Sequence, residues 1–295
     1  MPHKRITRLL DRFRITDGRN FRLKDFDPGD TAPDLIDHID AEALLARSVT
    51  HIAEMQSRLY AQNSWAVLCV LQAMDTAGKD GTIKHVMSGI NPQGVDVTSF
   101  KSPSSTELSH DFLWRINAAL PRRGHIAIFN RSHYEEVLVA RVHPEILQQQ
   151  HLPPQRIDRK IWKHRLEDIA RFEEYLDRQG TITIKFFLHI SRNEQKRRLQ
   201  ERLNDPAKHW KFDPNDMKER DYWDDYQNAF EAAIKATASK HAPWYVVPGD
   251  HKWFAHLIVG EALIHTLEKL NLDLPAETAE RKAMLDQARK SLNAE

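Results

Sequence analysis

Residues 65–82 read WAVLCVLQAMDTAGKDGT, and this stretch decides the fold class of the protein. It begins with a continuous apolar run at 65–71, which is typical of a strand buried on both faces of a sheet. A polar, glycine-containing loop follows at 73–82 and leads into a helical pattern. Such a loop binds phosphate where its backbone N–H groups and the helix N-terminus converge on the anion. The stretch therefore predicts an α/β domain with a phosphate-binding loop.

The loop carries residues suited to phosphate. Lys79 can neutralise phosphate charge, and Gly78 lets the backbone approach the anion without a Cβ clash. The usual pattern G-x-x-x-x-G-K-[ST] fails at both ends, because Ala73 replaces the first glycine and Asp80 replaces the hydroxyl residue. An ordinary glycine-containing turn is the alternative interpretation. We expect phosphate contacts along the loop and the first turns of its helix, from Ala77, Gly78, Lys79, Asp80, Gly81, Thr82 and Lys84.

Asp75 indicates a metal ion. A carboxylate inside a phosphate-binding loop repels the ligand unless a cation lies between them. Mg²⁺ that bridges the carboxylate and phosphate oxygens resolves this conflict, and Mn²⁺ could substitute for it. A turn aspartate without a metal is the alternative.

The rest of the chain alternates predicted strands and helices. We expect strands at 95–100, 125–129, 181–190 and 244–247, and helices at 41–61, 106–120, 156–178 and 253–270. This alternation predicts one domain over residues 1–295, a three-layer α/β/α structure with a central parallel sheet. A basic N-terminal arm at 1–40 is expected to be extended over 1–35. A helical insertion is expected at 192–240, and the last twenty residues look like an exposed helix or a frayed tail.

Polar residues follow the strand at 125–129, at the edge where open α/β sheets bind ligands. Arg131 and Arg141 stand where a transferring phosphoryl group needs charge compensation. Asn130 stands where many nucleotide-hydrolysing proteins place a metal-binding aspartate. Because an amide is a poorer Mg²⁺ ligand, metal binding falls to Asp75 or to the two glutamates at 135–136.

The insertion at 192–240 concentrates cations. Arg198 and Arg202 are four residues apart and share one helical face, and Lys208 and Lys211 follow. We interpret it as a lid that closes cations over phosphates and excludes water; a solvated, charged helical hairpin is the alternative. In the N-terminal arm, Lys24 is a further candidate contact for a polyanion.

Composition excludes several classes of protein. The chain has 43 Lys and Arg against 42 Asp and Glu, a formal net charge of +1, which argues against a general nucleic-acid coat. No run of about eighteen apolar residues predicts a membrane span. The N-terminus lacks the apolar region of a secretory signal, and the single cysteine, Cys69, excludes a disulfide framework. We expect a cytoplasmic protein.

Three motifs, in this order, resemble the second family of polyphosphate kinases: LQAMDTAGKD at 71–80, FNRSHYEEVL at 129–138 and PAKHWKF at 206–212. The similarity extends over roughly residues 10–270. It implies a P-loop kinase fold like that of thymidylate kinase, with a lid. It also implies Mg²⁺-dependent, reversible transfer of a terminal phosphoryl group between inorganic polyphosphate and a nucleotide.

The resemblance also implies roles for particular residues. The family's lid aspartate falls on Asp216. Asn130 departs from the aspartate of many members, and the subgroup with this asparagine and an acidic residue at Glu135 is associated with accepting AMP as well as ADP. The catalytic residues implied are Asp75, Lys79, Arg131 and Arg202. Together with the positions at the strand exit, we expect Asp75 and Glu135 as metal ligands, and Asn130, Arg131, Glu135 and Arg141 at the nucleotide acceptor site.

The partners implied are inorganic polyphosphate and adenine or guanine nucleotides, without a membrane or specific nucleic acid, in a homo-oligomer (dimer or tetramer). Two other functions fit the residues. One is an ATP-dependent kinase of nucleotides or small molecules with the same fold. The other is a non-catalytic polyphosphate- or RNA-binding protein, against which the set Asp75, Lys79 and Arg131 argues.

Overall fold

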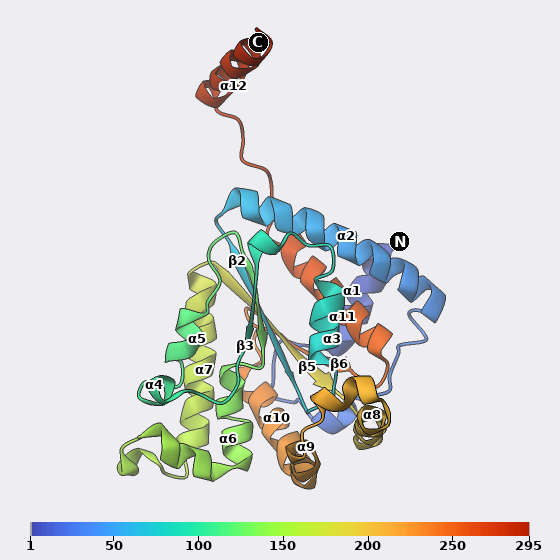
Figure 1. Cartoon of the computed structure of the whole chain (residues 1–295), viewed down its shortest axis with the longest axis vertical. Helices are drawn as coiled ribbons and strands as arrows, with labels where there is room; N and C mark the ends of the chain where they lie inside the picture. Colours follow the sequence, from blue (N-terminus) through green and yellow to red (C-terminus); the bar gives the residue numbers. More distant parts are fainter. Residues whose placement is uncertain (1, 295) are drawn as a thin grey trace.

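A six-stranded sheet forms the centre of the computed structural model, which describes residues 2–294 (Figure 1). The strand order is β1-β6-β5-β2-β4-β3. Strands β2 to β6 are parallel, as predicted, and β1 adds an unpredicted antiparallel edge strand beside β6. The strands span Arg14–Ile15 (β1), Ala66–Ala73 (β2), Val95–Ser99 (β3), Ile126–Asn130 (β4), Thr181–His189 (β5) and Trp244–Pro248 (β6).

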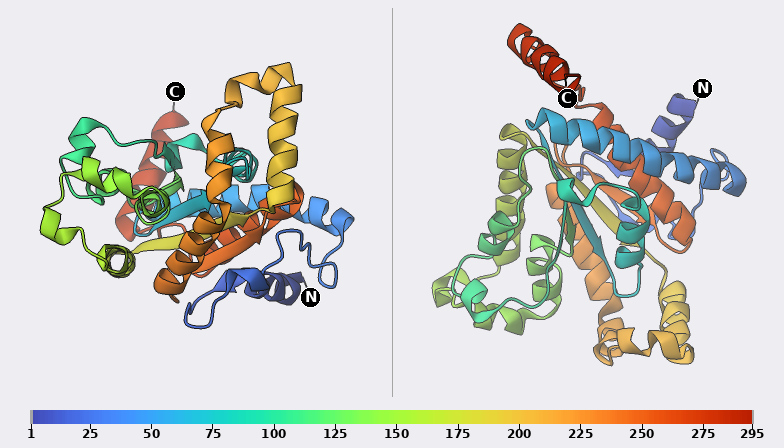
Figure 2. Two further views of the ribbon diagram at one scale, coloured as in Figure 1. Left: turned by 90° about the horizontal axis from the view of Figure 1, so that it is seen from below. Right: turned by 45° about the horizontal axis from the view of Figure 1, so that its top comes forward.

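Helices cover both faces of the sheet, which gives the three layers expected (Figures 1 and 2). One face carries α1 (Pro2–Phe13), α2 (His38–Gln62), α3 (Lys79–Val86) and α11 (Lys252–Glu268). The other carries α5 (Trp114–Ala118), α6 (Val139–Val142), α7 (Ile161–Arg178) and α10 (Trp223–Thr237). The remaining helices are α4 (Ser105–Leu108), α8 (Arg192–Asn204), α9 (Asn215–Glu219) and α12 (Ala279–Leu292). Short 3₁₀ turns lie at Leu23–Asp25, Pro92–Gly94, His133–Glu136, Pro144–Gln150, Pro154–Arg156, Pro206–Lys211 and Arg220–Tyr222.

Strand β2 positions the site. Every residue of β2 is buried, and the strand pairs with β5 on one side and β4 on the other. In this register Leu71 lies opposite Asn130, and the Arg131 N–H donates to the Leu71 carbonyl at 3.1 Å. The loop after β2 and the exit of β4 therefore meet at one edge of the sheet, as parallel strands require.

The first half of the N-terminal segment is not the extended arm that its composition suggested, although residues 16–37 contain only turns and one short 3₁₀ helix. Residues 2–13 form α1, and residues 14–15 form the edge strand β1. The apolar residues Leu9, Leu10 and Phe13 lie at helical spacing and are buried. The Phe13 ring packs edge-on against the Phe254 ring of α11, with ring centroids 5.7 Å apart. The burial of this apolar face stabilises the helix, and the basic residue Arg12 pairs with Asp30 and Asp34 of the segment that follows.

The helix expected at 106–120 is two short helices, α4 and α5. The carboxylate of Asp111 accepts the N–H of Leu113 at 2.9 Å, a donor that a continuous helix would use for its own backbone. A capping box of Ser104 and Glu107 starts α4. The expected helix is therefore interrupted by its own aspartate.

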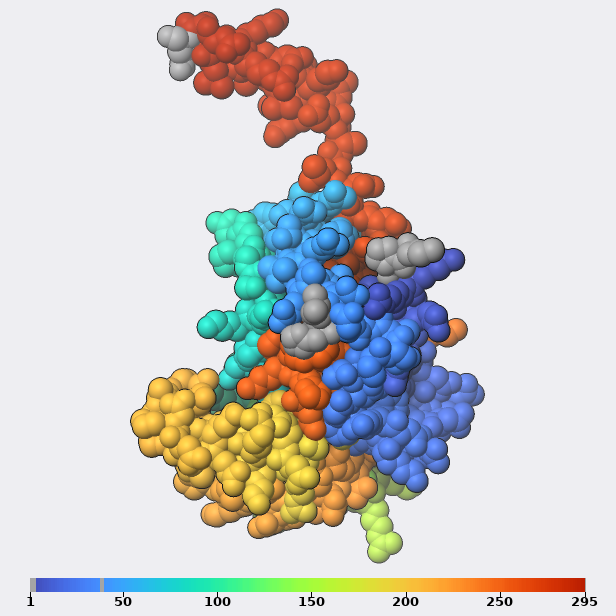
Figure 3. Space-filling model, turned by 90° about the vertical axis from the view of Figure 1, so that its right-hand side faces the viewer, coloured from blue at the N-terminus to red at the C-terminus, as the bar shows by residue number. Residues whose placement is uncertain are grey.

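The segment 192–240 divides into two parts. Residues 192–222 project from the body, whereas α10 packs in the helical layer (Figure 2). The Phe230 ring of α10 stacks on Phe187 of β5, with ring centroids 4.0 Å apart. At the C-terminus, α12 is an exposed helix that stands clear of the body (Figure 3). None of the described helices combines the length with the apolar composition that a membrane span requires.

Candidate functional site

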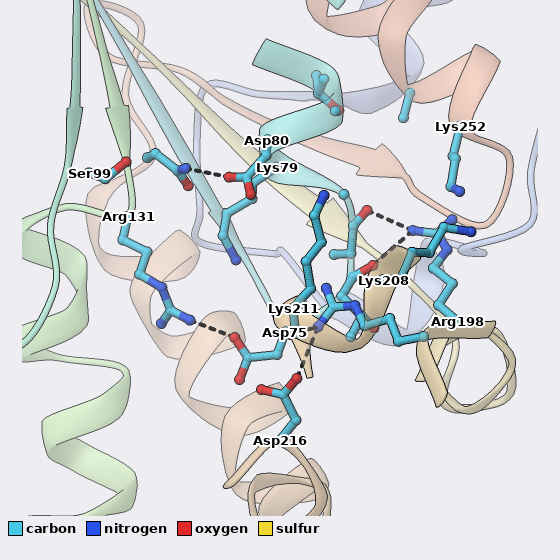
Figure 4. Close-up of a pocket in the computed structure, with 18 of the residues that line it drawn as sticks. Asp75, Lys79, Asp80, Ser99, Arg131, Arg198, Lys208, Lys211, Asp216 and Lys252 are labelled. Atoms are coloured by element: carbon cyan, nitrogen blue, oxygen red, sulfur yellow. Dashed lines mark hydrogen bonds and ion pairs between the residues drawn. The ribbon is translucent and has the colours of Figure 1, made fainter. Parts of the chain in front are cut away.

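A cavity of about 530 Å³ opens at the carboxyl edge of the sheet (Figure 4). Its floor is the loop after β2 with the start of α3, and its sides come from the exits of β3 and β4, the projecting segment and the start of α11. Most of the residues predicted to bind phosphate line it: Ala77, Gly78, Lys79, Asp80, Gly81, Thr82, Arg198, Lys208 and Lys211. The cavity also reaches Asp75, Asn130, Arg131, Arg202 and Asp216.

The backbone of the loop combines left-handed residues with the start of a helix, as in loops that bind anions. Thr76 and Gly78 are in the left-handed region, with φ of 65° and 103°, and α3 begins directly at Lys79. Glycine adopts this conformation readily, whereas threonine does so only where the surroundings hold it. Burial, and then the neighbouring charge of Arg131, lower the pKa of Lys79 to about 8. The Lys79 ammonium donates to the Ala73 carbonyl at 3.0 Å.

Arg131 joins two of the predicted carboxylates. Its guanidinium donates to Asp75 at 2.5 Å and to Glu135 at 2.8 Å, and the nearby carboxylates raise its pKa. Like Thr76, Arg131 has a positive φ, of 64°. The aspartate, the arginine and the glutamate that the sequence suggested are thus in direct contact.

Asn130 lies beside a residue of the loop helix. Its side-chain amide donates to Asp80 at 2.7 Å, in the first turn of α3. The amide therefore holds the exit of β4 against the loop helix.

The projecting segment brings cations over the cavity. Arg202 donates to Asp216 at 3.1 Å and to the Lys211 carbonyl at 3.2 Å. Lys211 lies over the Trp210 ring, 5.0 Å from its centroid. Arg198 behaves differently, because its guanidinium donates to the backbone carbonyls of Ala77 at 2.7 Å and Gly249 at 2.6 Å.

Four predicted residues lie outside this cavity: Glu135 lines only a second cavity that adjoins it, and three others line neither. Within the described residues, Lys24 on the first 3₁₀ turn, Lys84 on the exposed side of α3 and Arg141 on α6 line neither this cavity nor its neighbour. Lys101 and Lys252 were not predicted and do line it. Both follow strand ends, β3 and β6, so the rule that ligands bind beyond the carboxyl ends of strands could have found them.

A second cavity of about 440 Å³ adjoins the first. The two share Asp75, Arg131 and Asp216 in their walls. The second adds apolar and aromatic side chains at Val139, Ala140, Ile146 and Tyr226, together with Arg115 and a group of carboxylates at Glu135, Glu136, Asp213 and Glu219. The ion pair of Asp75 and Arg131 therefore stands between a cavity in which cations predominate and one in which carboxylates do.

The carboxylates at this junction fit a divalent cation. Burial, and then the charge of Asp75, raise the pKa of Asp216 to about 6. Two carboxylates that repel one another can share a cation whose other ligands are phosphate oxygens and water. Among the described residues, no group of three or more His, Cys, Asp or Glu is placed to hold a metal ion unaided. A metal here therefore needs the phosphates of a substrate.

Comparisons with known proteins identify similar chains. The sequence model of the family described as Polyphosphate kinase 2 matches residues 36–275. The chain is 44% identical over 278 residues to the AMP/ADP-polyphosphate phosphotransferase of Meiothermus ruber, covering 94% of this chain and 100% of that protein. It is 49% identical over 250 residues to the ADP-polyphosphate phosphotransferase of Rhodopseudomonas palustris, covering 84% and 86%. The crystal structure of polyphosphate kinase 2 from Arthrobacter aurescens is 40% identical, with a TM-score of 0.84, covering 92% of this chain and 95% of that one.

Proposed function

The chain belongs to the polyphosphate kinase 2 family, and from this premise we propose that it transfers the terminal phosphoryl group of polyphosphate to AMP and to ADP at the junction of its two cavities. The Meiothermus ruber relative is named for both acceptors, and the Rhodopseudomonas palustris relative is named for ADP. One site would then carry out both steps from AMP to ATP.

The observation that carries this proposal is the shared wall of Asp75 and Arg131. The first cavity is lined by cations from the loop, the projecting segment and α11, which suits a donor made only of phosphates. The second has apolar and aromatic surface, which suits the nucleoside of an acceptor. The reacting phosphates of donor and acceptor would meet at Arg131.

Phosphoryl transfer between two polyanions requires that the negative charges of donor and acceptor be neutralised. An oxygen of the acceptor's terminal phosphate forms a bond to the terminal phosphorus of polyphosphate. The bond from that phosphorus to the bridging oxygen breaks, and the shortened chain keeps the bridging oxygen as an anion. The attacking oxygen is already anionic, so no strong base is required. Lys79 and Arg131 would neutralise the transferring group, and Arg202 would act from the lid.

We assign Asp75 as the main carboxylate for Mg²⁺, with Glu135 as the second candidate ligand on the other side of Arg131. Bound Mg²⁺ would neutralise phosphate oxygens and orient donor and acceptor. The repulsion between Asp75 and Asp216 supports a cation at this place.

A nucleotide-product assay tests the proposal. The protein is incubated with polyphosphate, Mg²⁺ and AMP, ADP, GMP or GDP, without ATP, and the nucleotides are separated by chromatography. We expect ADP and ATP from AMP, and no product after chelation of the metal. Product that forms only when ATP is the donor would identify an ATP-dependent kinase. Salt-sensitive polyphosphate binding without turnover would identify a binding protein.

A further inference from the structure

Helix α8, at the base of the projecting segment, donates side-chain hydrogen bonds to the backbone carbonyls of the phosphate loop. Gln195 donates its side-chain amide to the Asp75 carbonyl at 3.1 Å. Arg198 donates to the carbonyls of Thr76 at 3.3 Å and Ala77 at 2.7 Å. Three consecutive carbonyls therefore face α8. The N–H groups of a loop can converge on an anion only when its carbonyls are directed elsewhere and satisfied there.

The guanidinium of Arg198 is fully used by these and other hydrogen bonds. Beyond Thr76 and Ala77, its second terminal nitrogen donates to the carbonyls of Gly249 at 2.6 Å and Asp250 at 3.3 Å. Its Nε donates to Glu194 at 2.6 Å. A guanidinium has five N–H groups, and among the described residues five acceptors are in place for them. The residue is 4% exposed, so it offers no N–H to a phosphate in this arrangement.

These hydrogen bonds act on a strained loop. Thr76 has a φ of 65°, a conformation that β-branched residues rarely adopt and that persists only where neighbouring groups enforce it. Gln195 also accepts a hydrogen bond from Arg220 at 2.6 Å, at the other end of the projecting segment. The two ends of this segment and the phosphate loop are thus joined through one buried glutamine.

We propose that Gln195 and Arg198 are positioning residues: they hold the loop carbonyls so that its N–H groups and Lys79 face the donor phosphates, and they fix the stem of the lid to the loop. This replaces the expectation that Arg198 binds phosphate, and it rests on the proposed function for the identity of the donor. The lid would then move beyond Arg198, at the tip that carries Arg202, Lys208 and Lys211.

The salt dependence of polyphosphate binding separates positioning from direct phosphate binding. For nucleic acids, the slope of log K against log salt concentration becomes shallower by about 0.7–0.9 for each cation that no longer neutralises a phosphate, and we expect a similar step for polyphosphate, which is also a linear chain of phosphates. Arg198→Gln removes the charge, and Lys208→Ala serves as the reference for a cation that binds phosphate directly. We expect Arg198→Gln to keep the parental slope, whereas the slope of Lys208→Ala becomes shallower by about one such step. A slope that is equally shallow in both variants would overturn the proposal.

Arg198→Lys and Gln195→Met test the hydrogen bonds themselves. Lysine keeps the charge but cannot serve five acceptors, and methionine keeps the shape of glutamine without its donor. We expect kcat to fall about tenfold or more in Arg198→Lys and by a smaller factor in Gln195→Met, with little change in KM for polyphosphate. The matched control is Lys196→Ala, on the exposed side of the same helix, which should behave as the parent. Near-parental kcat in Arg198→Lys would contradict the positioning role.

Hydrogen exchange tests the loop without any turnover. Peptides covering residues 74–80 should exchange faster in Arg198→Lys and Gln195→Met than in the parent and in Lys196→Ala, at unchanged melting temperature. Unchanged exchange in both variants would sink the proposal. If the parent fails to phosphorylate AMP and ADP from polyphosphate, the proposed function is wrong, but the exchange result still decides whether α8 holds the loop.

Discussion

The side-chain amide of Asn130 donates a hydrogen bond to the carboxylate of Asp80 at 2.7 Å. Each of these residues departs from the usual residue at its position, Asp80 from the hydroxyl residue of the phosphate loop and Asn130 from the aspartate of the strand exit. The structure shows that the two departures meet. An aspartate in place of Asn130 would face another carboxylate, so this amide keeps the junction from carrying one more negative charge.

The first prediction concerns Asn130→Asp and the choice of acceptor. The added charge would stand in the wall of the first cavity, next to Arg131 at the junction of the two cavities. AMP, the shorter acceptor, must bring its only phosphate closer to this junction than ADP does. We expect turnover with AMP to fall at least about tenfold more than turnover with ADP. Initial rates with both acceptors at saturating polyphosphate measure this.

Asn130→Ser is the control for that experiment, because it loses the amide without adding charge. It should affect AMP and ADP alike. A parent that phosphorylates ADP but leaves AMP untouched, or an Asn130→Asp variant that loses both acceptors equally, would refute this account of Asn130.

The second prediction concerns the loop residues Lys79 and Asp75. Removing one preorganised group that stabilises charge in a transition state costs about two to three decades of rate. We therefore expect Lys79→Ala and Asp75→Asn each to lower kcat by at least about a hundredfold. Melting temperatures should stay within a few degrees, since neither side chain belongs to the apolar core. Near-parental activity in either variant would show that the phosphates bind elsewhere.

The third prediction concerns Arg202. In this structure Asp216 holds Arg202 at 3.1 Å, so a phosphate must compete with that carboxylate when the lid closes. A charge delivered on closure acts mainly in the transition state. We expect Arg202→Ala to lower kcat by about tenfold to a hundredfold with little change in KM for the nucleotide, as steady-state kinetics would show. A raised KM at parental kcat would instead assign Arg202 to ground-state binding. Lys196→Ala, on the exposed side of the same helix, is the control.

The sequence could predict the part of the site that is formed by contiguous residues and by the ends of neighbouring parallel strands. The buried run at 65–71 and the loop after it are contiguous, and the exits of parallel strands meet at one edge, so Asp75, Lys79 and Arg131 were expected together and were found in one cavity. The five parallel strands followed from the same alternation of patterns.

What sequence could not predict depends on distant contacts. The basic residues within 1–24 suggested an extended arm, whereas residues 2–13 form an amphipathic helix whose apolar face is buried against α11. The spacing of Arg198 and Arg202 placed both on one face, and both line the cavity, yet the Arg198 guanidinium is occupied by the carbonyls of the phosphate loop whereas Arg202 pairs with Asp216 of the projecting segment. Only the fold brings Thr76 and Gly249 beside the same guanidinium.

The last prediction concerns the proton on Lys79. Burial and the charge of Arg131 lower the pKa of Lys79 to about 8 in the free protein, from an ordinary 10.5. A lowered lysine pKa means that the folded protein holds fewer protons than the unfolded chain between these two values, so this group favours folding more as pH rises through that range. A bound polyanion has the opposite effect, because it stabilises the charged ammonium and raises the pKa again. Binding of polyphosphate at about pH 9 should therefore take up a proton that Lys79 lacked.

Calorimetric titrations in two buffers of different ionisation enthalpy give the number of protons taken up. Titrating phosphate groups contribute in every variant, so the difference from Lys79→Arg is the informative quantity, since arginine stays charged at this pH. We expect the parent to take up more protons than Lys79→Arg at about pH 9, and the difference to vanish at about pH 6.5, where Lys79 is already charged. An equal uptake by the two proteins at pH 9 would mean that Lys79 is charged before the phosphates arrive. In that case the negative charges of Asp75, Asp80 and Glu135, which raise the pKa of Lys79, would outweigh the effect of its burial, which lowers it.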